Sequence, residues 1–204
     1  DRAVQIAMKE IEILESEGVD GIIVENYHGD ISDVKKTLEA IKDPKLLVGI
    51  NILPNDYLFA FQLAKEYKAH FIQVDYVSGN YRNSPRVDIA QFTNCREHYP
   101  DVTVLGGVWP KYYHPTTESV LFDDLKQGTY LADAIVVTGE GTGKETPLAK
   151  IEEFRKILGK HPLIVGAGMT PASVQAQLSI SDGAIVGSCF KPLGQTTQKI
   201  NKSL

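Results

Sequence analysis

A strict alternation of short apolar runs with amphipathic stretches constrains the fold of this chain more than any other feature. The apolar runs lack polar–apolar alternation, which is typical of parallel strands buried on both faces. They recur about every 20–31 residues, and segments of helical period separate them. We therefore predict seven strands, at Gly21–Val24, Leu46–Leu53, Phe71–Val77, Val102–Val108, Ala134–Val137, Leu163–Val165 and Ala184–Val186.

The segments between these strands predict helices, because their apolar residues recur at helical spacing. Asp56 is a candidate N-cap of a helix that runs to Ala69. Thr170 is a second candidate N-cap, with Pro171 at the first helical position. The other predicted helices are Arg2–Glu17, Ile31–Lys42, Asp88–Tyr99, Glu118–Tyr130 and Leu148–Leu158.

Regular strand–helix alternation is typical of a (β/α) barrel or of a doubly wound sheet. Glycine or polar residues follow every predicted strand here, whereas an open sheet concentrates its ligand loops at one switch point. We therefore predict an α/β fold, a TIM (β/α)8 barrel in a single domain spanning residues 1–204. The chain opens on a helix and supplies one strand too few. We expect the first strand to lie upstream of Asp1, which makes the domain N-terminally incomplete; an open barrel or closure by a partner are the alternatives.

The composition limits the classes of partner. The formal net charge of −5 argues against nucleic-acid binding, which needs a basic face. No apolar run approaches the ~18 residues of a membrane span. The two cysteines provide neither a disulfide framework nor metal-ligand spacing, so a reducing, cytoplasmic location is expected.

Glycines follow the last two predicted strands, where (β/α)8 barrels commonly bind phosphate. Glycine lets the backbone approach an anion and leaves its N–H groups available. We assign phosphate binding to Gly166, Gly168, Gly187 and Ser188. The alternative is that these glycines only permit tight turns.

Two carboxylates lie at neighbouring strand ends on the same rim. Glu25 and Asp75 could act as acid and base, or could share Mg²⁺; no other cofactor or metal motif is evident. Lys111 lies in an aromatic loop, where it could meet an anionic group, pair with Asp75, or remain solvated. We predict these three residues as catalytic, and Glu25 or Asp75 could equally be a structural ion-pair partner of Lys111.

The remaining candidates for substrate contact lie at or just after the carboxyl ends of predicted strands. The glycine-rich segment 139–143 resembles a mobile ligand loop more than a nucleotide P-loop, because it lacks the G-x-x-x-x-G-K-[ST] spacing. The predicted substrate-binding residues are Asn26, Asn51, Thr138, Glu140, Gly141 and Thr142.

Five segments in order resemble motifs of the BtpA/SgcQ family. They are Asp20-Gly21 to Glu25-Asn26, Val48–Leu53 with Asn55-Asp56, Val137–Gly143, Gly166–Pro171 and Asp182–Lys191. The chain departs from the family at Gln73 and Asp75, where Arg and Asn are usual, and at Pro110-Lys111-Tyr112, where the family has V-K-H.

The resemblance implies a barrel like those that bind ribulose phosphates, in a family named for a photosystem I biogenesis factor and also labelled as nucleosidases. We therefore expect a phosphorylated sugar or nucleoside-type ligand at the carboxyl-terminal rim, with hydrolase or lyase chemistry. A non-catalytic assembly factor that keeps the barrel without the chemistry is the alternative. We also expect a homo-oligomer.

Overall fold

The computed structural model of this chain describes residues 2–42 and 44–200. Within these residues, parallel strands form one seven-stranded sheet in chain order from β1 to β7. The strands are β1 (Gly21–Glu25), β2 (Leu47–Asn51), β3 (Phe71–Val74), β4 (Thr103–Gly107), β5 (Ala134–Val137), β6 (Leu163–Val165) and β7 (Gly183–Ala184).

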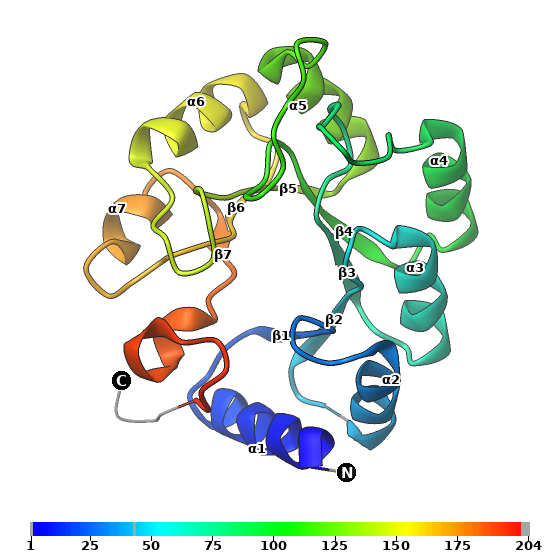
Figure 1. The fold of residues 1–204 in the computed structure, drawn as a ribbon, viewed down its shortest axis with the longest axis vertical. Helices are drawn as coiled ribbons and strands as arrows, with labels where there is room; N and C mark the ends of the chain where they lie inside the picture. Colours follow the sequence, from blue (N-terminus) through cyan, green and yellow to red (C-terminus); the bar gives the residue numbers. More distant parts are fainter. Residues whose placement is uncertain (1, 43, 201–204) are drawn as a thin grey trace.

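A helix precedes or follows each strand and covers the outside of the curled sheet (Figure 1). The helices are α1 (Arg2–Ser16), α2 (Ile31–Ala40), α3 (Tyr57–Glu66), α4 (Ile89–His98), α5 (Leu121–Leu131), α6 (Leu148–Leu158) and α7 (Val174–Leu178). Two 3₁₀ turns, η1 (Ser188–Phe190) and η2 (Pro192–Gly194), follow β7. The predicted (β/α) barrel architecture is therefore confirmed.

The sheet does not close within the described residues. β1 pairs only with β2, and β7 pairs only with β6, so a gap separates β1 from β7. This arrangement is that of a (β/α) barrel that lacks one strand. Because all pairings are parallel, the carboxyl ends of the strands meet at one rim, where ligand sites of this fold lie.

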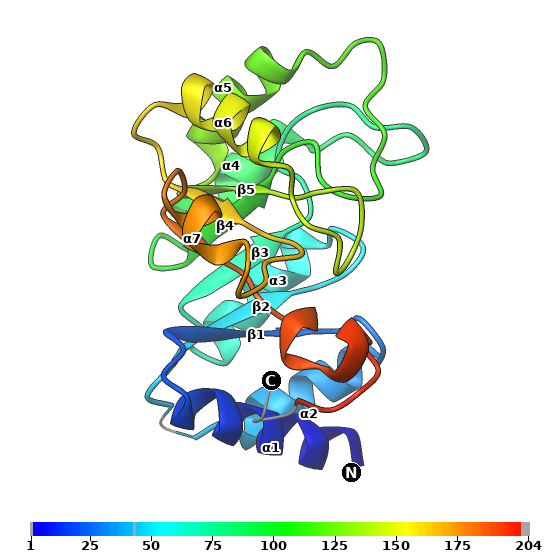
Figure 2. The ribbon, with the colours of Figure 1, turned by 90° about the vertical axis from the view of Figure 1, so that its left-hand side faces the viewer.

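The core lies between the sheet and its helices. Ile50, Ile72 and Ile135 project from the strands and are fully buried, as are Phe61 of α3 and Phe92 of α4. Burying such side chains contributes about 1.5–3 kcal/mol each, before the entropy of ordering them is subtracted. α1, in contrast, has no buried residue among those described. Its Glu10 carboxylate instead accepts hydrogen bonds from the Lys191 ammonium and the Ile200 amide, so the C-terminal segment lies beside α1 (Figures 1 and 2).

One hydrogen-bonding arrangement occurs three times at the amino ends of the strands, opposite the rim. His70, Asp133 and Asp182 stand immediately before β3, β5 and β7. The side chain of each accepts a hydrogen bond from a strand amide, at 3.0 Å from Val48, 2.8 Å from Val104 and 2.8 Å from Leu163, respectively. The backbone amide of each donates to the carbonyl of that same strand residue. Arg96 and Arg155 also bind the two aspartates. These anchors fix the register of neighbouring strands.

Two sequence-based boundaries are wrong near the last strands. The helix predicted from Thr170 and Pro171 begins at Val174, with Ser173 at its N-cap position. The intervening residues form a turn in which the Ser173 amide donates to the Thr170 hydroxyl, so Thr170 caps this turn and not the helix. The strand predicted over Ala184–Val186 pairs only at Gly183–Ala184, because η1 begins soon afterwards. Asp56, in contrast, is confirmed as an N-cap, since its carboxylate accepts from the Phe59 amide.

Candidate functional site

A cavity of about 2160 Å³ occupies the centre of the ring and opens at the rim. It extends through the gap between β1 and β7 as far as α1, which explains its size. Ten of the predicted site residues line it: Glu25, Asn51, Asp75, Lys111, Thr138, Thr142, Gly166, Gly168, Gly187 and Ser188. The structure therefore gathers most of the predicted rim residues around one space.

Three predicted substrate contacts do not line the cavity: Asn26, Glu140 and Gly141. The Asn26 amide group instead holds the turn after β2, donating to the Leu53 carbonyl at 3.0 Å and accepting from its amide at 2.8 Å. Glu140 is exposed. These positions support the rim or lie beside it.

The acidic side of the rim lies at the ends of β1, β2 and β3. Glu25 is the last residue of β1, its register partner Asn51 is the last residue of β2, and Asp75 directly follows β3. The Asn51 amide donates to Glu25 Oε2 at 3.2 Å. The Tyr113 hydroxyl donates to Asp75 Oδ2 at 2.6 Å. Asn51 is only 2% exposed, so it is a fixed spacer between the two carboxyl groups.

Both carboxyl groups are less acidic than in water. Burial raises the pKa of Asp75, while the hydrogen bond from Tyr113 and the charge of Lys111 oppose this rise. Glu25 is accessible from the cavity, yet protein atoms surround it, and this desolvation raises the pKa of its carboxyl group. Asn51 and Lys111 oppose that shift, while the nearby Asp75 charge adds to it. Carboxyl groups tuned in this way can exchange protons with a ligand.

Lys111 lies opposite these carboxylates. Its backbone amide donates to the Thr138 hydroxyl at 2.6 Å, and its ammonium donates to the Thr142 hydroxyl at 3.0 Å. Among residues 2–42 and 44–200, no carboxylate lies within ion-pair distance of this ammonium. The direct Lys111–Asp75 ion pair considered from the sequence is therefore absent there, and the two groups interact at longer range.

The glycine side of the rim lies after β6 and β7. The Gly166 amide donates to the Val137 carbonyl at 2.8 Å, so it extends the strand pairing and is not available to an anion. The amides of Gly168, Gly187 and Ser188 have no acceptor among the described residues. Gly168 has a φ of +67° and packs against the backbone of Lys144, whereas open space surrounds Gly187. Three of the four predicted phosphate contacts thus keep a free backbone donor.

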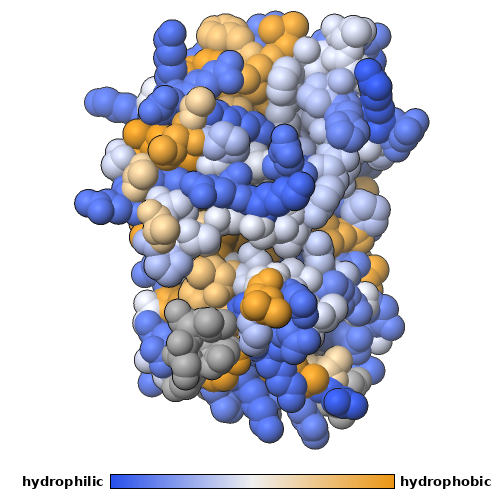
Figure 3. Space-filling model, turned by 60° about the vertical axis from the view of Figure 1, so that its left-hand side comes forward, coloured by the Kyte–Doolittle hydropathy of each residue, from blue (hydrophilic) through white to orange (hydrophobic). Residues whose placement is uncertain are grey.

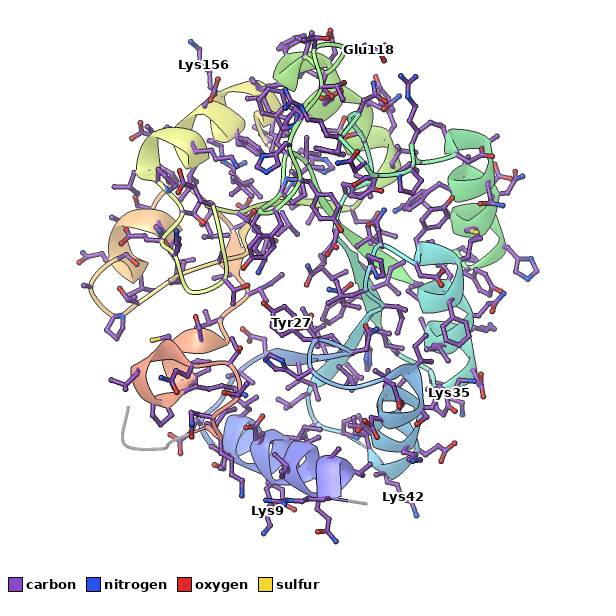
Figure 4. The ribbon with its side chains drawn as sticks, in the orientation of Figure 1. Lys9, Tyr27, Lys35, Lys42, Glu118 and Lys156 are labelled. Carbon is purple, nitrogen blue, oxygen red and sulfur yellow. The ribbon has the colours of Figure 1, made fainter. Side chains whose placement is uncertain are left out.

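The loop after β5 crosses the mouth of the cavity. The Thr142 hydroxyl lies 3.1 Å from the Tyr27 hydroxyl, which belongs to the loop after β1, and the Thr142 amide donates to the Tyr112 hydroxyl at 2.8 Å. The hydrogen bonds of Thr142 lower the pKa of Tyr112. Tyr27 lies near the centre of the ring (Figure 4). Sequence reasoning missed Tyr27, although its position two residues after Glu25 places it on the ligand rim.

The family model of the BtpA family matches residues 1–203. The chain belongs to the BtpA family. An uncharacterized protein of Methanocaldococcus jannaschii is 32% identical to it over 98% of this chain and 82% of that protein. The photosystem I biogenesis protein BtpA of Synechocystis is 26% identical over 97% of this chain and 75% of its own length.

Solved structures show the same architecture. Phosphoribosyl anthranilate isomerase from Thermus thermophilus superimposes with a TM-score of 0.63 at 12% identity, covering 96% of this chain and 88% of the isomerase. The isomerase from Pyrococcus furiosus gives a TM-score of 0.63 at 15% identity, covering 97% and 89%. At this identity the likeness extends to the barrel fold alone. No described helix of this BtpA family member combines the length and apolar character that crossing a membrane requires.

Proposed function

We propose that this protein binds a phosphorylated sugar or nucleoside-type small molecule at the carboxyl-terminal rim of its barrel. The observation that carries this proposal is the group of backbone amides at Gly168, Gly187 and Ser188, which have no acceptor within residues 2–42 and 44–200. They lie on a cavity that also holds the Lys111 ammonium, which has no carboxylate partner in that same part of the chain. Backbone amides bind phosphate without a charged side chain, and a lysine adds the counter-charge.

The reaction that suits this arrangement is hydrolase chemistry of the nucleosidase type, or a lyase step. Glu25 is accessible from the cavity and would activate water as a general base, while Asp75 would exchange a proton with the leaving group. An N-glycosidic bond breaks through an oxocarbenium-like transition state, which a neighbouring carboxylate stabilises. Asn51 and Thr138 would orient the ligand between the carboxylates and the anion.

Titration of the protein with inorganic phosphate and ribose 5-phosphate, followed by calorimetry, tests the binding proposal. Gly187→Leu is the informative variant, because a Cβ at Gly187 meets nothing within 4 Å and the side chain extends into the open space. We expect a loss of affinity of roughly tenfold or more with an unchanged Tm. Undiminished binding in this variant would contradict the assignment of the anion to this turn.

Glu25 and Asp75 would also hold Mg²⁺, if the ligand is bound through a metal. Carboxylate oxygens and water are the ligands that Mg²⁺ prefers, and both carboxylates face the same cavity. Among the described residues, no cluster of three or more acidic, histidine or cysteine side chains has metal-binding geometry. Such an ion would therefore keep several water ligands and would bind weakly.

The second candidate is a non-catalytic assembly factor, and the printed name of the Synechocystis relative favours it. Gln73, Asp75 and Tyr112 depart from the residues usual in the family, which fits lost chemistry. This candidate predicts that Glu25→Gln and Asp75→Asn leave function in cells intact. A loss of function in a folded Glu25→Gln or Asp75→Asn protein would decide for the enzyme.

We also propose that the protein is a cytoplasmic homo-oligomer. A related fold, the isomerase of Thermotoga maritima, is described as dimeric. Large exposed apolar side chains such as Phe122 and Tyr130 are available for contacts, although the face in Figure 3 shows apolar groups scattered among hydrophilic ones. Light scattering of the purified protein gives the mass that tests the oligomer.

A further inference from the structure

The Lys111 ammonium lies at the cavity mouth and makes only weak interactions in the part of the chain that the structure describes. It donates to the Thr142 hydroxyl at 3.0 Å and lies 6.0 Å from the centre of the Tyr112 ring. Among the described residues, neither a carboxylate nor a backbone carbonyl accepts from it. A neutral hydroxyl compensates a partly buried ammonium less well than an anion does, because charge-assisted hydrogen bonds are roughly twice as strong.

Thr142 joins three loops of the rim at one residue. Its hydroxyl is shared by the Lys111 ammonium and the Tyr27 hydroxyl, at 3.0 and 3.1 Å. Tyr27 is 115 positions away in the sequence and approaches from the β1 side of the mouth. The Thr142 amide is held separately, by the Tyr112 hydroxyl at 2.8 Å. The hydroxyl therefore closes a bridge across the mouth that can break without loss of the amide contact.

This bridge lies beside the free amides. Gly143 follows Thr142 directly, has a φ of +74°, and approaches the turn after β7 so closely that a Cβ there would lie 3.5 Å from Ser188 Oγ. An anion on the Gly187 and Ser188 amides would therefore lie next to the Thr142 bridge and within the neighbourhood of Lys111. Gly143 is also exposed, so the backbone on this side of the bridge has room to move.

We propose that the Thr142 hydroxyl occupies the anion position on Lys111 in the free protein, and that a phosphate group of the ligand displaces it. Binding then exchanges the Lys111–Thr142 contact for a Lys111–phosphate contact and breaks the Tyr27–Thr142 bridge, which opens the mouth. Lys111 is on this account an anion-binding residue, and Thr142 a competing internal ligand. The inference rests on the proposed function and specifies how the same site is controlled.

Inorganic phosphate is the probe, and its dissociation constant is measured by calorimetry for the unaltered protein and four variants. In Thr142→Val, phosphate no longer competes with a hydroxyl, so we expect affinity to rise about three- to tenfold. In Lys111→Met, the counter-charge is lost, so we expect affinity to fall about tenfold or more. In the double variant Lys111→Met/Thr142→Val, the gain from the valine should largely disappear, because it acts through Lys111.

Thr129→Val is the matched control, because Thr129 lies on α5 and its hydroxyl donates to the Lys126 carbonyl of the same helix. It should leave the phosphate affinity unchanged. Unaltered or weaker binding in Thr142→Val overturns the competition, and unaltered binding in Lys111→Met overturns the role of Lys111. These failures leave the proposed function standing as long as the unaltered protein binds phosphate. If neither the unaltered protein nor Thr142→Val binds phosphate, the proposed function fails as well.

Discussion

The two sides of the barrel rim present different kinds of group to the same cavity. The β1–β3 side presents side chains, namely two carboxyl groups with a buried amide between them. The β6–β7 side presents the backbone itself, through three amides that have no acceptor in the part of the chain that the structure describes. The acidic side depends on protonation states, which pH and single hydrogen bonds change. The glycine side depends on backbone conformation, which at Gly168 has a positive φ and leaves no room for a side chain.

The largest effect we expect is on the glycine side. In Gly168→Ala, a Cβ would lie 2.1 Å from the Lys144 carbonyl group at a φ of +67°, so the backbone must shift. We expect a loss of about 3 kcal/mol or more in the free energy of unfolding. Gly187→Ala is the matched control, since its Cβ meets nothing within 4 Å and should change stability by less than about 0.5 kcal/mol. Urea denaturation measures both, and equal losses would mean that the two glycines play the same role.

A smaller effect is expected from Tyr113→Phe on the acidic side. The variant removes a donor to Asp75, which should cost about 1 kcal/mol of stability. It should also raise the pKa of Asp75 further, because the Tyr113 hydrogen bond opposes the effect of burial. Titration of the carboxyl carbons by NMR measures that pKa. Tyr67→Phe serves as the control, since it removes a similar bond to Glu39 on the outer surface.

The pH dependence of stability should reveal the raised pKa of Glu25. Burial raises its folded pKa above the ordinary value of 4.5, so the unfolded chain releases this proton at lower pH than the folded protein does. The ionised form therefore destabilises the fold as pH rises from 4.5 through the raised pKa, and not below it. Glu25→Gln should match the unaltered protein at about pH 3.5 and exceed its Tm by about 2 °C at neutral pH. A constant difference in Tm across this range would contradict the shift.

The smallest expected effect concerns Mg²⁺. An ion shared by Glu25 and Asp75 should raise the Tm by about 1 °C when its concentration equals its dissociation constant. Either Glu25→Gln or Asp75→Asn should remove this increase. If both variants retain it, the ion binds elsewhere on the acidic surface.

The sequence predicts the barrel and the rim well, because both depend on local patterns. Buried parallel strands are continuous apolar runs; Glu25 directly follows such a run, and Asn51 and Asp75 lie near the carboxyl ends of two others. The sequence does not indicate which backbone donors remain free. Gly166 and Gly168 look alike in the sequence, yet only the Gly166 amide is used by the neighbouring strand.

Contacts between distant loops are also beyond local patterns. The Tyr27–Thr142 contact depends on the curvature that brings the loops after β1 and β5 across the mouth toward one another. Two hydroxyl residues, Thr170 and Ser173, both suit the N-cap of α7, and Ser173 occupies that position. Which of the two becomes the N-cap depends on the turn that leads out of β6.

The anchors before β3, β5 and β7 have a consequence for how such a protein can change over evolution. Each ties one strand to its neighbour at the end of the sheet opposite the rim, through both a side chain and a backbone amide. Strand order is thus secured without help from the loops that carry the ligand groups. Those loops can exchange residues, as at Tyr112, and acquire new specificities while the scaffold beneath them persists.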